Sequence, residues 1–252
     1  MDAQQRSYLI RPDSPLWKLP HGLDPLQASF LDAIRLSVQF IDVAYNRVED
    51  TLTNLKLDSD RALQLGPTAL MDAWTIVDAV HRLRALVSGM PRYKNRAPSK
   101  RLFLMRTVGV EALRNSFQHL VNDLHERTQS DLPVLGALTW VRPINAKENT
   151  LSIETFIPGQ FRSIDPSSVV EVPTTVPDRL GHIELWVGVH NVDVSKLRHA
   201  VCELVLALQN AAVSPDPAGS PPGPCDAMAT ITVMLTPSAP HESLDAIPPR
   251  AG

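Results

Sequence analysis

The chain of 252 residues is long enough for one large domain or two small ones, and its 44% of hydrophobic residues can bury a core. Its two cysteines, Cys202 and Cys225, exclude a disulfide-rich scaffold and are expected to be free thiols. No apolar run approaches the roughly 18 residues of a membrane span, and the first residues lack the apolar core of a signal peptide. We therefore expect a soluble, cytoplasmic protein with no membrane partner.

An irregular, proline-rich segment, residues 1–23, precedes a long predicted helix. Asp24 is a suitable N-cap for this helix, and Pro25 suits its first position. Apolar residues then recur at spacings of three and four, which predicts a stripe that packs on another helix. The stripe comprises Leu31, Ile34, Val38, Ile41, Tyr45, Val48, Leu52 and Leu55.

Two more helices are predicted before residue 130. Gly66 and Pro67 are expected to break the chain, with the second helix running from there to about Val87. The third is expected from about residue 99 to residue 127, bent at Gly109.

Residues 131–236 change to an apolar period of two, which predicts an antiparallel sheet. Strands are expected at 134–141, 150–157, 181–189 and 228–235, and Asp193 can cap a helix that ends near Ala212. The predicted fold class is therefore α+β: an N-terminal antiparallel helical bundle (24–130), then a small antiparallel β-sheet with one packed helix. That helix, 193–212, is also a candidate to complete the bundle, and residues 237–252 are predicted to be a disordered tail.

A basic block interrupts this mildly acidic chain, because residues 79–110 contain no Asp or Glu. Such a block is typical of a place where a polyanion docks, although a solvated basic loop has the same composition. The candidates for nucleic-acid binding are Arg92, Lys94, Arg96, Lys100 and Arg101.

The third predicted helix carries the clearest chemical motif. On a helical wheel, Leu113, Phe117, Leu120 and Leu124 form the stripe that is expected to face the core. Asn115 and His119, one turn apart, lie on the opposite side, and Arg114 lies on the flank between them. A solvent-facing polar surface is the simpler interpretation of this pattern.

The spacing Arg114-Asn115-x-x-x-His119 resembles the R-N-x-x-x-H signature of HEPN domains (higher eukaryotes and prokaryotes nucleotide-binding). The resemblance covers roughly residues 24–128. It implies a helical bundle that dimerises, with the Arg and His of two copies near one cleft, and many such domains are metal-independent ribonucleases. One departure is the β-rich segment that intervenes before the last helix, and members that keep the fold without activity leave open a protein-binding adaptor or dimerisation module.

The resemblance also implies a reaction, attack of an RNA 2′-hydroxyl on the adjacent phosphodiester. His119 then acts as general base or acid, since histidine ordinarily titrates near neutrality. Arg114 stabilises charge on the phosphoryl oxygens, and Asn115 orients the imidazole or the phosphate. No metal or other cofactor is required, and the partners are RNA and a second copy of the chain.

Three other features have weaker functional interpretations. His182, Glu184 and His190 are expected on the outward face of one strand, where a metal site is less common than a solvated edge. Trp186 shares that face and can stack on a ligand or pack beneath the last helix. His81, beside the basic block, either helps to bind phosphate or lies on a helix surface. A further alternative is a ligand-sensing module with an apolar pocket between sheet and helix.

Overall fold

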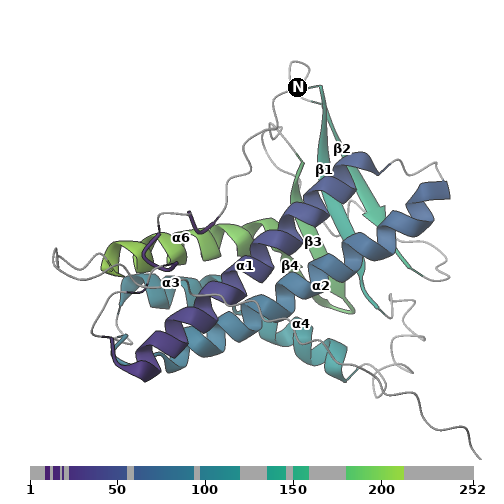
Figure 1. Cartoon of the computed structure of the whole chain (residues 1–252). Helices are drawn as coiled ribbons and strands as arrows, with labels where there is room; N and C mark the ends of the chain where they lie inside the picture. The colour runs from purple at the N-terminus through teal and green to yellow at the C-terminus, as the bar shows by residue number, and fades with distance from the viewer. Residues whose placement is uncertain are drawn as a thin grey trace, which may run out of the picture.

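The computed structural model describes residues 9–11, 14–17, 19, 23–55, 60–93, 97–119, 135–145, 150–158 and 180–212. Within these ranges the chain forms five helices and one four-stranded antiparallel sheet (Figure 1), which confirms the α+β class. The predicted strand at 228–235, residues 120–127 of the third predicted helix and the tail lie outside the described residues.

The first helix, α1 (Pro25–Asn54), forms as predicted. The Asp24 carboxylate accepts a hydrogen bond of 2.8 Å from the Leu26 N–H and caps the helix. All eight residues of the predicted apolar stripe are buried. They pack largely on α2 (Asp60–Gly89), which lies alongside α1 in Figure 1.

The predicted break at Gly66 and Pro67 is wrong, because α2 runs through both residues. Pro67 removes one backbone hydrogen bond but does not end the helix. Gly66 has a packing role instead. A Cβ atom built on it would lie 2.7 Å from Cζ of Phe156, so only glycine lets the Phe156 ring approach the helix this closely.

The third predicted helix is two helices, α3 (Pro98–Arg106) and α4 (Gly109–Gln118). The chain turns at Thr107 and Val108, just before the predicted bend at Gly109. Thr107 is buried, and its hydroxyl donates to the Phe103 carbonyl at 2.7 Å, which satisfies a carbonyl at the end of α3.

The sheet has the strand order β2-β1-β3-β4, with every neighbouring pair antiparallel. Strands β1 (Ala137–Asn145), β2 (Thr150–Phe156) and β3 (Gly181–Val187) match predicted strands. The short strand β4 (His190–Asp193) was not predicted. It pairs with β3 across a two-residue turn, in which Gly188 has a φ of 58° that suits glycine.

Two predictions about the outward face of β3 are wrong. Glu184 and Trp186 are buried, and the Trp186 indole N–H donates to the Thr139 hydroxyl at 3.3 Å, so this face of the sheet is not open. His190 lies on β4 opposite Val187, on the other face from Glu184 and Trp186. The turn at Gly188 causes this difference, because it reverses the chain where an uninterrupted strand was expected.

One hydrophobic cluster joins the helices to the sheet. The last helix, α6 (Val194–Ala212), starts at the predicted cap and packs on α3, β3, α1 and α2. Its predicted apolar residues are all buried, namely Leu197, Val201, Leu204, Val205 and Leu208. Helix α6 therefore contacts both the bundle and the sheet, and its N-terminal end lies beside the start of β3.

Candidate functional site

The motif helix α4 displays two of the three motif residues to solvent. Leu113 is buried, whereas Asn115 and His119 are exposed on the outer side, as the wheel predicts. His119 is the C-cap of α4, and its backbone N–H donates to the Asn115 carbonyl at 3.0 Å. Phe117, which the wheel predicts in the core, is partly exposed, and the centroid of its ring lies 4.3 Å from that of the Trp74 ring on α2.

Arg114 is directed towards α2. Its Nε donates to Asp78 Oδ1 at 3.1 Å, and Asp78 Oδ2 accepts from Arg82 Nη2 at 2.5 Å. Burial acts to raise the pKa of Asp78, but the hydrogen bonds and charges of Arg82 and Arg114 outweigh it and lower the pKa. Arg114 and His119 are five positions apart, about 140° around the helix, and no contact between them is found among the described residues.

The charge of Arg114 acts on the imidazole of His81, on α2. Burial lowers the pKa of His81, and the nearby charge of Arg114 lowers it further. The carboxylates of Glu111 and Asp78 act in the opposite direction. The contact between α2 and α4 thus brings a guanidinium and an imidazole together with the carboxylates of Asp78 and Glu111, and Arg114 is ion-paired to Asp78.

The basic block divides into exposed and internal cations. Lys100 is buried, and its ammonium donates to the carbonyls of Ser88 at 3.0 Å and Tyr93 at 3.4 Å. This burial lowers the pKa of Lys100. Arg92 and Arg101 are exposed, whereas Lys94 and Arg96 lie outside the described residues.

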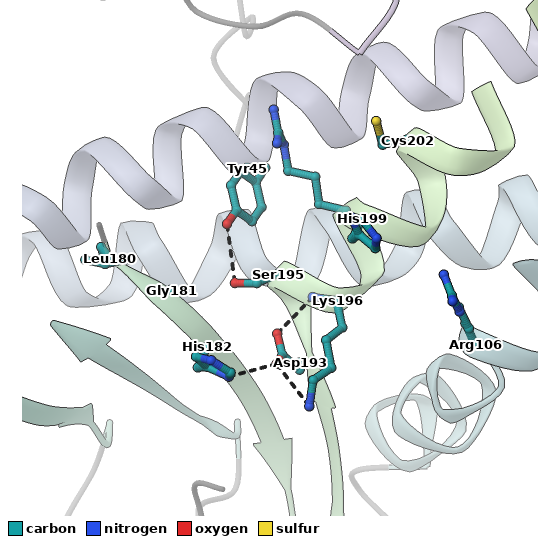
Figure 2. Close-up of a pocket in the computed structure, with 11 residues that line it drawn as sticks. Tyr45, Arg106, Leu180, Gly181, His182, Asp193, Ser195, Lys196, His199 and Cys202 are labelled. Carbon is teal, nitrogen blue, oxygen red and sulfur yellow. Dashed lines mark hydrogen bonds and ion pairs between the residues drawn. The ribbon is translucent and has the colours of Figure 1, made fainter. Parts of the chain in front are cut away.

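A cleft of about 760 Å³ lies where the N-terminal half of α6 meets α1, α3 and the start of β3 (Figure 2). Five of its lining side chains are basic and one is acidic. The lining residues are Tyr45, Arg106, Leu180, Gly181, His182, Asp193, Ser195, Lys196, Arg198, His199 and Cys202.

Two carboxylates pair with basic side chains of the cleft, Asp193 in the lining and Glu203 beside it. Asp193 Oδ2 lies 3.7 Å from His182 Nδ1 and 3.6 Å from Lys196 Nζ (Figure 2). Glu203 of α6 accepts from Arg106 of α3 and lies 3.2 Å from His199 Nε2. Hydrogen bonding by Arg106 lowers the pKa of Glu203.

Hydrogen bonds connect the cleft residues of α1, β3 and the start of α6 to one another. The Tyr45 hydroxyl donates to Ser195 Oγ at 3.3 Å, and Ser195 Oγ also accepts from the Ile183 N–H at 3.2 Å. Arg198 stacks over the Tyr45 ring at 4.8 Å and contacts Asp42 Oδ1 at 3.4 Å. Arg198 is only 20% exposed, whereas Arg106 and Lys196 are 40% and 61% exposed, so these two are the more accessible permanent cations of the cleft.

Asp193 and His182 show local features that are typical of functional sites. Asp193 Oδ1 caps α6 by accepting from the Lys196 N–H at 3.0 Å. Its Oδ2 is buried and, within the described part of the chain, accepts no hydrogen bond. His182 has a φ of 47°, a left-handed conformation that is uncommon for a residue other than glycine and is often found at binding sites.

Only partial signals for this cleft are present in the sequence. The sequence predicts Asp193 as a helix cap, makes His182 a candidate metal ligand and places Tyr45 in a core stripe. A polar stripe on α6 is visible in the sequence, because intervals of three and four separate Lys196, His199 and Glu203 and place them on one side of the helix. Arg106 joins them only because α3 packs against α6.

Neither a metal cluster nor a membrane helix is found in the described ranges. No three His, Cys, Asp or Glu side chains there are grouped to hold a metal ion. None of the helices in these ranges is long and apolar enough to cross a membrane. Comparison of the chain with protein families, curated proteins and solved structures found no match.

Proposed function

We propose that this protein binds a small phosphate-bearing ligand in the cleft between α6, α3 and β3. The observation that carries the proposal is the lining of the cleft, in which five basic side chains accompany one carboxylate. Concave sites with a few convergent charged groups are the usual form of small-molecule sites. Phosphate oxygens are strong acceptors for guanidinium, ammonium and imidazolium donors.

The present partners of these cations do not prevent such binding. The side chains of Arg106 and Glu203 are 40% and 38% exposed, and exposed ion pairs contribute little stability. A ligand phosphate can therefore replace Glu203 as the partner of Arg106 at small cost. The Lys196 side chain is more exposed still, at 61%, so its ion pair with Asp193 is also weak.

Calorimetric titration of the protein with inorganic phosphate and pyrophosphate tests this proposal. We expect binding that also raises the melting temperature, because a ligand of the folded state stabilises it. Arg106→Gln and Lys196→Gln should each weaken binding roughly tenfold, the effect of losing one charge-assisted hydrogen bond. Arg101→Gln is the matched control on α3, since Arg101 is exposed and outside the cleft. Equal affinity in all four proteins would reject the proposal.

A second candidate function is a HEPN-like endoribonuclease centred on α4. The observation that favours it is the exposure of Asn115 and His119 on the outer side of α4, where a second copy or an RNA strand has access. Arg114 is directed to Asp78, so catalysis in a dimer requires its guanidinium to be shared between Asp78 and the phosphate. The two sites can coexist, since no motif residue lines the cleft.

RNA cleavage in the presence of a chelator tests this second function. An active nuclease leaves 2′,3′-cyclic phosphate ends, and His119→Ala should abolish them, whereas His190→Ala, an exposed histidine on β4, should not. Cleavage that survives His119→Ala removes this residue from the mechanism. Intact RNA together with self-association or binding of a protein partner would favour the adaptor function instead.

A further inference from the structure

The cleft contains an unmatched acceptor as well as its cations. The Asp193 side chain is only 6% exposed, and its Oδ2 accepts no hydrogen bond within the described residues. Buried carboxylate oxygens normally have a donor, because an unsatisfied acceptor loses the hydrogen bonds that water would supply. The Lys196 ammonium and His182 Nδ1 lie 3.6 and 3.7 Å from Oδ2, beyond hydrogen-bonding distance.

Binding of a phosphate would also take a charge partner from Asp193 Oδ2. The Lys196 side chain is 61% exposed and belongs to a flexible residue, so its ammonium can turn from Asp193 to a ligand phosphate. Asp193 cannot follow, because Oδ1 is held by the N-terminal turn of α6. Oδ2 then needs a new donor from the same ligand, close to the phosphate that Lys196 contacts.

We infer that the ligand carries a hydroxyl group close to its phosphate, as sugar phosphates and polyol phosphates do, and that Asp193 Oδ2 accepts its hydrogen bond. This inference rests on the proposed phosphate binding in the cleft. A hydroxyl is the appropriate donor, since it is neutral and adds no charge beside Lys196 and His182. A carboxylate at the same place is disfavoured, because it would be repelled by Asp193.

The test compares two ligands that differ in their hydroxyl groups. Glycerol 3-phosphate and propyl phosphate have the same phosphate and a chain of three carbons, but only the first has hydroxyls. Calorimetry on the whole chain should show at least about tenfold tighter binding of glycerol 3-phosphate, the usual effect of a hydrogen bond to a charged acceptor. Ribose 5-phosphate should show the same preference over propyl phosphate.

Two variants assign that preference to Asp193. Asp193→Asn and Asp193→Ser both keep an N-cap acceptor for α6, so the fold is retained, but both lose the anionic Oδ2. In each, the preference for glycerol 3-phosphate should fall severalfold, while propyl phosphate should bind as well as before or better. Unchanged melting temperature without ligand verifies that each variant is folded, and if one fails to fold the other decides.

The outcomes separate the two proposals. If inorganic phosphate and propyl phosphate bind but glycerol 3-phosphate is not preferred, the inference about the hydroxyl is rejected and phosphate binding stands. A preference that persists in both variants rejects the role of Asp193. If none of the phosphates binds to the parent protein, the proposed function fails, and the inference fails with it.

Discussion

At the scale of single residues, Arg142 of β1 shows how one side chain connects the sheet to a helix end. Its guanidinium donates to the carbonyls of Leu52 at 2.6 Å, Thr53 at 3.0 Å and Leu55 at 3.2 Å, at the C-terminal end of α1. It also pairs with Glu154 of β2 through two nitrogens, at 2.8 and 2.9 Å. The last carbonyls of a helix lack intrahelical donors and favour a nearby cation. Arg142 supplies both the hydrogen-bond donors and the positive charge.

Arg142→Lys should therefore lower the free energy of unfolding by about 1–3 kcal/mol, although it keeps the charge. A single ammonium cannot reach three carbonyls and both oxygens of Glu154 at once. Urea denaturation measures the change, and Arg101→Lys, at an exposed position of α3, should change stability by less than about 0.5 kcal/mol. An equally small effect of Arg142→Lys would show that this network adds little to stability.

Asp72 of α2 illustrates the opposite case, a buried charge that opposes folding. Burial raises its pKa above the ordinary value of 3.8, and the charge of Arg47, whose Nε lies 3.2 Å from Oδ2, offsets this only in part. The folded state therefore holds the proton more tightly than the unfolded state does. It follows that ionisation of Asp72 reduces stability as the pH rises from 3.8 through the raised pKa.

Asp72→Asn, which mimics the protonated acid, should increase the free energy of unfolding at pH 7. The gain should shrink as the pH falls and be absent below 3.8, where both states carry the protonated acid. Urea denaturation of both proteins between pH 3.5 and pH 7 measures this. A gain that does not depend on pH would mean that the effect arises from packing rather than from the charge of Asp72.

At the scale of elements, replacing Gly66 of α2 by alanine has two opposing effects on stability. Alanine favours a helix over glycine by about 1 kcal/mol. The added Cβ would meet the Phe156 ring of β2 well inside contact distance, and such overpacking costs about 1–3 kcal/mol. We therefore expect Gly66→Ala to lower the melting temperature in thermal unfolding. Gly89→Ala, on the same helix, places its Cβ at an ordinary 3.5 Å from Phe30 and should be neutral or stabilising.

A second substitution identifies the cause of the loss. In the double variant Gly66→Ala/Phe156→Leu, the smaller side chain gives the new Cβ room. The double-mutant cycle should then show a favourable coupling energy of about 1 kcal/mol or more. Additive effects of the two substitutions would show that α2 and β2 do not meet at this point.

Helices α1 and α6 could be predicted from the sequence and the cleft could not, for a physical reason. The one-sided spacing of the α1 stripe and the cap at Asp193 depend on residues within a few positions along the chain. The role of Gly66 depends on Phe156, ninety positions later, and a glycine-proline pair by itself indicates a break. The same applies to Arg114, since its spacing to His119 is visible in the sequence, whereas its contact with Asp78 requires α4 to pack on α2.

The cleft illustrates this limit most clearly. Its side chains come from α1, α3, β3, β4 and α6, and β4 follows a two-residue turn that the sequence predicts as part of one longer strand. The polar residues of α6 could be assigned to one side of a helix. Their convergence with Arg106 and His182 follows only from the way α6 fits between the bundle and the sheet.

At the scale of the whole molecule, the helical and β-rich halves share one hydrophobic cluster, to which the N-terminal segment also contributes. Leu16 is fully buried in it, together with residues of α1, α2, β1, β3 and α6. The Leu9 N–H donates to Asp42 of α1 at 3.3 Å, and Gln209 of α6 donates to Ser14 at 2.8 Å. The described residues of the segment that the sequence predicts as irregular thus contact both α1 and α6.

A shared core predicts that both halves unfold together. Leu16→Ala removes buried methyl groups and should lower the free energy of unfolding by about 2–5 kcal/mol. In hydrogen exchange, the slowest amides of α1 and of β1 should lose the same free energy of opening, because one cooperative unit contains both. Leu26→Ala, at an exposed position of α1, should leave both unchanged within about 0.5 kcal/mol. A loss of protection in α1 without a matching loss in β1 would show that the bundle and the sheet are separate folding units.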